Sequence, residues 1–289
     1  MRVFNITYLL VFAMLLWGGG WSALKVLTYN TPADVIVFWR FFFMSLSFLP
    51  ILYILKIPFK FEKKSVIFVT SGAFLNIAFM VSAFFGIKYG FAGAGSVAIT
   101  TLSPIMTFLL VSIIFRKKIT PIKLFGLFLG LVGGAILLEL NNLELFLDGA
   151  NLFFLLCALV WGGITLLSQH SQRYIHPIYY SFFISVFATC ITFLYVVSSD
   201  FMVVFEQGWQ FWFALLYLSV LGQSVATTIF FIASGKIGSE KTSSFMFLVP
   251  VFALSISYIV LDEELQLHTV VGGVVSMLAV FFINKKELK

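Results

Sequence analysis

The sequence predicts an all-α membrane protein with ten transmembrane helices, arranged as two inverted five-helix repeats with both termini cytoplasmic. Three observations predict this fold class. Of the 289 residues, 61% are hydrophobic and only 10% are charged, whereas soluble globular proteins carry about 25% charged residues. The apolar residues form ten separate runs. Tryptophan, glycine and proline motifs of the first half recur in the second half.

Each of the ten runs reaches or approaches the length of a membrane span, since a helix crosses the bilayer core in about 20 apolar residues. The runs are continuous rather than alternating, which predicts helices instead of a barrel. Arg2 and the apolar run after it resemble a signal peptide, but no convincing cleavage site follows, so we expect an uncleaved first helix. The predicted spans are 6–27, 34–55, 65–87, 93–115, 121–138, 150–170, 177–198, 211–234, 241–261 and 267–284.

The loops predict the orientation, because cytoplasmic loops are enriched in Lys and Arg. With the N-terminus inside, most of the 18 Lys and Arg residues fall in loops on that side, and the loops on the other side are acidic. Both termini are therefore expected in the cytoplasm, in a multi-pass protein of the inner (plasma) membrane. The formal charge of +6 comes from these loops, so we expect a lipid bilayer and no nucleic acid as partner.

An internal repeat divides the chain into two halves. Trp17-Gly18-Gly19 recurs as Trp161-Gly162-Gly163, and Pro104 recurs as Pro250. The predicted domains are a first repeat at 1–138, an outer connecting loop at 139–149 and an inverted repeat at 150–289. Inverted repeats are a recurrent design of secondary transporters, in which substrate binds near the membrane midplane between the halves.

Two charged triplets follow the prolines, Arg116-Lys117-Lys118 in the first half and Asp262-Glu263-Glu264 in the second. Five helices are an odd number, so the second half must enter the membrane upside down. Opposite charge at equivalent positions agrees with that orientation. We therefore interpret the triplets as markers of topology rather than as binding sites.

Several short motifs strengthen this interpretation. They are Phe38-Trp39-Arg40-Phe41, Gly93-Ala94-Gly95-Ser96 with Ser103-Pro104, and Leu261-Asp262-Glu263-Glu264-Leu265 with Gly272-Gly273. Together the motifs resemble the EamA family of the drug/metabolite transporter superfamily over essentially the whole chain. The resemblance implies export or facilitated movement of small metabolites, such as amino acids, by alternating access. One departure is Arg116-Lys117-Lys118, where family members often carry an acidic residue; it bears on loop electrostatics rather than on the fold.

Arg40 is the one unambiguous charge inside a predicted span. A charge at the bilayer centre costs about 2.5–3.5 kcal/mol on insertion scales, so Arg40 should face the protein interior or an aqueous cavity. Its guanidinium is suited to bind a substrate carboxylate. The alternative is a structural arginine that extends toward the outer surface or caps carbonyls of a neighbouring helix.

Aromatic and polar residues inside the spans complete the candidate site. Tryptophans beside glycines can wall a cavity with a flat apolar face and one N–H donor, or can simply pack. Polar groups in a span need either a substrate or another helix as partner. The candidate substrate-binding residues besides Arg40 are Trp17, Trp21, Asn76, Trp161, Tyr180, Gln223, Thr227 and Ser244. The candidate hinges, which are alternatively static kinks, are Pro104 and Pro250.

The sequence lacks the groups that other functions require. No Asp or Glu lies well inside a predicted span, which disfavours proton-coupled export of cationic drugs. Paired carboxylates, a metal cluster and a convincing Ser/His/Asp set are also missing, so we expect no enzyme, metal or cofactor. The expected function is transport, by a monomer, of small organic metabolites such as amino acids or similar amphipathic carboxylates. The alternatives are a non-transporting membrane sensor or scaffold, or an exporter of cationic drugs.

Overall fold

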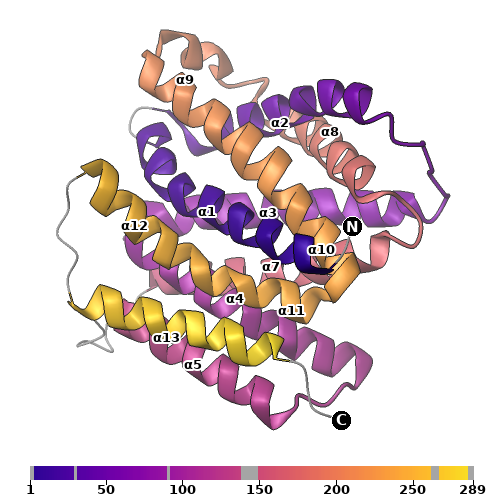
Figure 1. The fold of residues 1–289 in the computed structure, drawn as a ribbon. Coiled ribbons are helices and arrows are strands. Elements are labelled where there is room, and N and C mark those ends of the chain that lie inside the picture. Colours follow the sequence, from indigo (N-terminus) through magenta and orange to yellow (C-terminus); the bar gives the residue numbers. More distant parts are fainter. Residues whose placement is uncertain (1–2, 29–30, 90–91, 138–148, 262–266, 286–289) are drawn as a thin grey trace.

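The computed structural model describes residues 3–28, 31–89, 92–137, 149–261 and 267–285. Helices account for nearly all of the secondary structure in these ranges, and the one β-bridge joins Phe61 to Ile175 (Figure 1). The predicted outer loop, except for residue 149, and the acidic triplet lie outside the described residues.

Each of the first five predicted spans coincides with one helix. These helices are α1 (Val3–Leu27), α2 (Ala33–Leu55), α3 (Ser65–Tyr89), α4 (Ala92–Phe115) and α5 (Pro121–Leu137). The predicted spans 150–170, 177–198 and 267–284 correspond to α7 (Gly149–Ser171), α8 (Pro177–Val196) and α13 (Leu267–Asn284). A short 3-10 helix, η1 (Phe201–Glu206), follows α8.

The other two predicted spans are not continuous α-helices, which corrects the prediction. The span 211–234 consists of α9 (Trp209–Leu216), a π-helix η2 (Tyr217–Thr227) and α10 (Thr228–Ile237). The span 241–261 consists of α11 (Ser239–Ser244), a 3-10 helix η3 (Phe245–Leu248) and α12 (Val249–Leu261). Hydropathy indicates the length of an apolar run but not its backbone hydrogen-bond register. The change from an α-helix to a π-helix or a 3-10 helix therefore cannot be predicted from the hydropathy pattern.

The helices have the length and composition expected of a membrane protein. Six helical segments of the described chain are long and apolar enough to cross a bilayer, and they lie in α2, α3, α4, α7, α8 and the run Trp209–Ile237. Shorter apolar helices occupy Ile6–Trp21, Pro121–Leu137 and Val270–Asn284. Ten spans and the orientation of the termini stay predictions.

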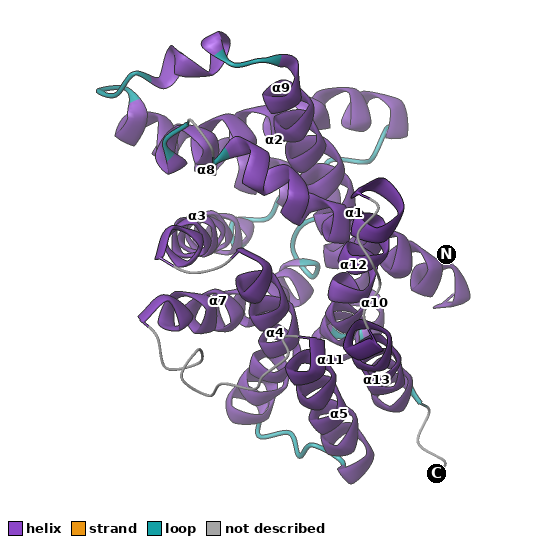
Figure 2. Ribbon diagram, turned by 90° about the vertical axis from the view of Figure 1, so that its left-hand side faces the viewer, coloured by secondary structure: helices purple, strands orange, loops and turns teal. Residues whose placement is uncertain are grey.

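The helices form two groups with matching internal contacts. The α7 bundle consists of α3 and α4 packed on α7; the α1 bundle consists of η2 and α12 packed on α1, with the neighbouring α9, α10, α11 and η3. Figure 2 shows α3, α4 and α7 on one side and α1, α10 and α12 on the other. Two further pairs, α2 with α8 and α5 with α13, join the halves. In all of these pairings, a helix of the first half of the chain packs on a helix of the second half. The inverted repeat itself stays a prediction.

Glycines set the closest helix crossings in both bundles. A Cβ atom at Gly18 would lie 2.9 Å from the backbone nitrogen of Ala253, so α1 touches α12 almost backbone to backbone. At the equivalent crossing, a Cβ at Gly162 would lie 3.1 Å from the nitrogen of Thr107 on α4. Small residues permit such approach between apolar helices. Because Gly18 follows Trp17 and Gly162 follows Trp161, the two crossings bring both tryptophans toward the middle of the protein.

The two prolines lie in different local structures. Pro104 is inside α4, as predicted. Pro250 is the second residue of α12, directly after η3, rather than midway along a continuous helix. Proline is tolerated in the first turn, where its missing N–H has no intrahelical partner to lose. The role of both prolines as hinges stays a prediction.

Candidate substrate cavity

A cavity of about 120 Å³ lies between the two bundles. Its walls come from α1, α2, α3, α4, α7, η2, η3 and α12, and it extends from the middle of the protein toward the end where α1 finishes and α2 begins. Seven of the nine predicted substrate-binding residues line it: Trp17, Trp21, Arg40, Asn76, Trp161, Gln223 and Thr227. The sequence therefore locates residues that the fold brings together from five separate elements.

Two tryptophans from opposite bundles meet at one wall of the cavity. The rings of Trp17 and Trp161 are 5.2 Å apart between centroids and nearly perpendicular, at 82°. Phe230 contacts both rings, and Phe79 lies 4.9 Å from Trp161. Edge-to-face packing of this kind adds about 0.5–1.5 kcal/mol per pair beyond area burial. The cluster therefore joins the bundles at equivalent positions of the two halves.

The two indole nitrogens have different environments. Trp17 Nε1 donates a hydrogen bond to the carbonyl oxygen of Gly222 at 2.9 Å. That oxygen also accepts a bond from Thr227 Oγ1 at 3.2 Å, five residues ahead, as the wide turn of the π-helix allows. Trp161 Nε1 is buried and has no hydrogen-bond partner among the described residues. Trp161, a lining residue of the cavity, therefore has a buried N–H donor without a partner in the described chain.

Arg40 lines the cavity from the second turn of α2. The preceding Trp39 packs against Phe42, Phe43 and Phe205, and its Nε1 donates to the carbonyl of Phe201 at 2.8 Å. These contacts fix the rotation of α2 and hence the side on which Arg40 lies. The Nε atom of Arg40 is buried without a hydrogen-bond partner, and neither ion pair among the described residues involves Arg40. An unpaired buried charge is costly and calls for an anion or for water.

Polar side chains on the facing helices are partly satisfied. Asn76 Nδ2 donates to the carbonyl of Gly72 at 2.8 Å, and Thr100 Oγ1 donates to that of Ser96 at 2.7 Å, so both bond to their own helices. Gln223 Oε1 is buried with no partner in the described chain. The described residues that line the cavity thus include one positive charge, one unpaired indole N–H and one unpaired amide oxygen, among mostly apolar side chains.

With this geometry in place, the family can be assigned. The model of the EamA-like transporter family matches residues 5–138 and 149–285. The chain belongs to this family. The resemblance in the short motifs is thereby confirmed, and the chain is a multi-pass membrane transporter.

Relatives of this EamA-family transporter include proteins that are named transporters. The chain is 22% identical to the uncharacterized transporter YoaV of Bacillus subtilis (strain 168) over 92% of each protein. It is 23% identical to an uncharacterized transporter of Archaeoglobus fulgidus, over 96% of this chain and 97% of that one. The WAT1-related protein At3g02690, chloroplastic, of Arabidopsis thaliana is 30% identical over 70% of this chain and 50% of its own length. A solved crystal structure shares the fold, with a TM-score of 0.74 over 98% of this chain and 97% of the other at 14% identity.

Two predicted binding residues of the EamA-family transporter lie outside the cavity lining. Tyr180 is fully buried on α8 beside Gly72 and Phe231. Ser244 accepts a hydrogen bond from Asn284 Nδ2 and donates one to the carbonyl of Lys241, each at 2.8 Å, so it connects α11 to α13. Nothing in this geometry supports a substrate contact for either residue, and their binding role stays a prediction.

The sequence did not point to most of the apolar wall. Phe79, Met80, Phe84, Leu218 and Met246 line the cavity although each is an ordinary hydrophobic residue of its span. The sequence contained one indication of this wall, since the same spacing separates Pro104 from Pro250 and Thr100 from Met246. In the described part of the chain, no group of three or more His, Cys, Asp or Glu residues could hold a metal ion.

Proposed function

We propose that this EamA-family transporter moves small organic metabolites that carry a carboxylate, such as amino acids or similar amphipathic acids, across the inner membrane. The observation that carries the proposal is Arg40, a guanidinium that lines the cavity and has no acidic partner among the described residues. A substrate carboxylate would pair with it through two parallel charge-assisted hydrogen bonds. Such a ligand supplies the charge that the cavity wall lacks.

The remaining free atoms suit an amphipathic ligand with both donors and acceptors. Trp161 Nε1 would donate to a second acceptor of the substrate, and Gln223 Oε1 would accept from an ammonium, amide or hydroxyl group. The apolar wall, which includes Met80 and Phe84, would hold a hydrocarbon part. A zwitterion with a short apolar side chain meets all three requirements.

The size and charge of the cavity argue against a cationic drug. An engineered cavity of about 150 Å³ holds one benzene molecule, and the volume here is about 120 Å³. Drug-sized ligands occupy pockets of about 300–1,000 Å³. Among the side chains that the structure describes, Arg40 is the only charged one in the cavity lining, and it would repel a cation.

Alternating access between the two inverted repeats is the mechanism that we propose. This mechanism is supported by hydrogen bonds and an ion pair that join the α7 bundle to the α1 bundle. They lie on the side of the tryptophan pair away from the cavity. Ser168 Oγ and Ser234 Oγ are 2.8 Å apart, and Ser239 N donates to Gln169 Oε1 at 3.0 Å. Lys117, after α4, forms an ion pair with Glu240 on α11. Opening the cavity toward this end would require these bonds to break while the bundles close at the other end.

Counterflow in proteoliposomes tests the proposal with labelled amino acids, organic acids, nucleobases and cationic dyes. We expect flux of acids or zwitterions, and we expect Arg40→Gln to weaken their apparent affinity about ten- to hundredfold, as for loss of a charged hydrogen bond. Neutral substrates should be affected much less. The control is Lys285→Gln, which removes an exposed positive charge outside the cavity.

Two outcomes would contradict the proposal. Equal loss for charged and neutral substrates in Arg40→Gln would make Arg40 structural. Saturable binding without flux for every compound would identify a sensor rather than a transporter of these metabolites.

A further inference from the structure

A second hollow, of about 230 Å³, lies where the connection between α2 and α3 meets α8. It is entirely apolar and mostly aromatic. Its lining residues, which we call the phenylalanine groove, are Phe59, Phe61, Val66, Val69, Phe183 and Phe187. None of them lines the cavity between the bundles, so the groove is a separate site.

Several contacts hold the groove in shape. Tyr179 Oη donates to the carbonyl of Ile57 at 3.1 Å, and Phe61 pairs with Ile175 in the antiparallel bridge. The ring of Phe61 lies 5.2 Å from that of Phe183 in a T-shaped contact and stacks with Phe59. The connection is therefore fastened to the start of α8 by backbone, side-chain and ring contacts, and the groove is a built feature of the surface.

The aromatic wall is open to the surroundings. The side chains of Phe59 and Phe187 are 63% and 42% exposed. Tyr and Trp side chains are enriched at the level of the lipid headgroups, and Tyr179 contacts Phe59 and Phe183 of the groove. We therefore expect the groove to open at the boundary between headgroups and acyl chains.

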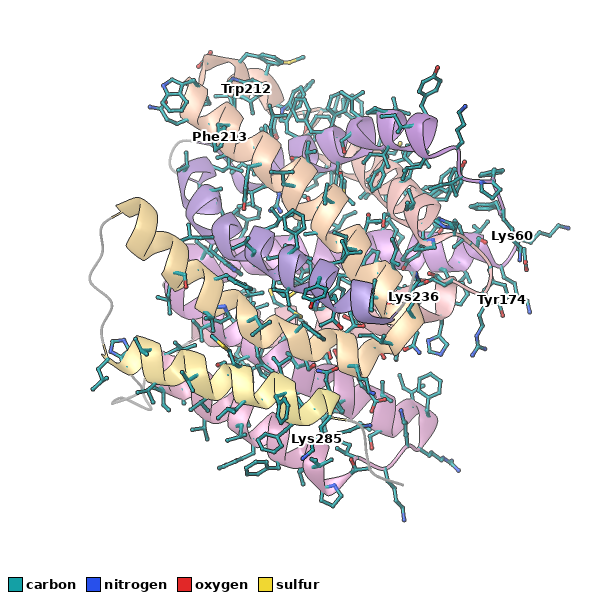
Figure 3. The ribbon with its side chains drawn as sticks, viewed as in Figure 1. Lys60, Tyr174, Trp212, Phe213, Lys236 and Lys285 are labelled. Atoms are coloured by element: carbon teal, nitrogen blue, oxygen red, sulfur yellow. The ribbon has the colours of Figure 1, made fainter. Side chains whose placement is uncertain are left out.

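Exposed positive charges lie on the same connection and just before α8. Lys56, Lys63, Lys64 and Arg173 are exposed, and Lys64 Nζ lies 5.5 Å above the ring of Tyr174. The one acid of the connection, Glu62, is paired with Lys60 at 3.0 Å, so these four cations are not neutralised by it. In Figure 3, Lys60 and Tyr174 lie near each other, far from Trp212 and Phe213 at the other end of the protein.

We propose that the phenylalanine groove binds an anionic phospholipid. One acyl chain lies in the groove, and Lys63, Lys64 and Arg173 contact the phosphate and the charged headgroup. A zwitterionic lipid offers the same chain but no net charge to match the cations, and a soluble phosphate offers no chain to fill the groove. Basic residues next to membrane helices attract anionic headgroups by about 1 kcal/mol per charge. The site does not depend on the transport proposal.

The test uses the full chain in detergent, with bound lipid counted by native mass spectrometry. The probes are phosphatidylglycerol, phosphatidylcholine and glycerol phosphate. We expect phosphatidylglycerol to bind more tightly than phosphatidylcholine, and the double variant Lys63→Gln, Lys64→Gln to lose about thirtyfold in affinity, at about fivefold per charge. The matched control is Lys236→Gln, Lys285→Gln, which removes two exposed cations from elsewhere on the protein and should leave affinity unchanged.

Four results would overturn the proposal. Equal affinity for both phospholipids, or an equal loss of affinity in the control variant, would mean that the cations attract lipid only through the overall charge of the protein. Binding of glycerol phosphate as tight as that of phosphatidylglycerol would identify a soluble phosphate as the ligand. Phosphatidylglycerol with a photoreactive acyl chain should cross-link to Phe183 or Phe187, and cross-links confined to other helices would remove the groove from the site.

Discussion

The two tryptophans at the cavity wall permit a matched experiment, because they differ in one hydrogen bond. Replacing either with phenylalanine removes an indole N–H and some aromatic surface. Trp17→Phe also breaks the 2.9 Å bond to the carbonyl of Gly222, whereas Trp161 Nε1 has no partner to lose among the described residues. The loss of packing is common to both variants, so the difference between them isolates the bond.

The magnitude follows from the partners. A hydrogen bond contributes a net 0.5–1.5 kcal/mol, about 1 kcal/mol on average. The Gly222 carbonyl keeps its bond from Thr227, so Trp17→Phe does not leave it unpaired. We expect Trp17→Phe to be less stable than Trp161→Phe by about 0.5–1 kcal/mol, since removing an unpaired buried donor costs nothing. If Trp161 Nε1 binds substrate, Trp161→Phe should lose more transport.

Denaturant titration of the purified variants without substrate measures the first effect, and proteoliposome flux measures the second. We expect opposite rankings of the two variants in the two assays. Equal loss of stability in both variants, or a less stable Trp161→Phe, would contradict a stabilising bond from Trp17 to Gly222. A rank order that is the same in both assays would mean that the flux merely follows folding.

Three further predictions use other matched groups. Gly163→Ala should stabilise α7 by about 1 kcal/mol through helix propensity, because its Cβ would meet nothing closer than 3.8 Å. Gly162→Ala should instead cost about 1–3 kcal/mol by overpacking against α4. Equal melting temperatures for the Gly162→Ala and Gly163→Ala variants would contradict the close contact of Gly162 with α4. Burial lowers the pKa of His176, whose Nδ1 accepts from the N–H of Ile178 at the start of α8; stability should fall as pH drops below about 6.5, and His176→Asn should remove this dependence in melting curves. Lys117→Glu should break the ion pair with Glu240 and make a cysteine introduced among the bonds between the two bundles more accessible to labelling. Adding Glu240→Lys should restore the ion pair and the protection. A double variant that stays accessible would rule out a role for this ion pair.

The helices could be predicted from the sequence more completely than the cavity. Apolar runs predicted the helices because burial in a bilayer depends on length and composition alone. The repeat also predicted that Trp17 and Trp161 occupy equivalent places, and the structure brings their rings to 5.2 Å. Their role in binding stays a prediction, as does that of Arg40.

The hydrogen-bond register of the helices and the contacts between distant residues could not be predicted from the hydropathy pattern. The π-helix that contains Gly222 and Gln223 has the same hydropathy as an α-helix, since register changes no residue type. The ion pair of Lys117 with Glu240 joins two helix ends that are distant in sequence, and only the packed bundles bring them into contact. The sequence interpretation of Lys117 as a topological marker therefore missed its contact with the other half.

The pairing of α5 with α13 has a consequence for how the chain is made. A Cβ at Gly126 or Gly133 on α5 would lie 3.1 Å from a carbonyl oxygen of α13, so these glycines form a flat face that only α13 fills. α5 ends at Leu137, whereas α13 begins at Leu267. During synthesis α5 must therefore wait in the membrane, with this face against lipid, until α13 has been made. A chain that stops before residue 267 would leave that face bare, and such truncated products should be recognised by membrane proteases as unassembled.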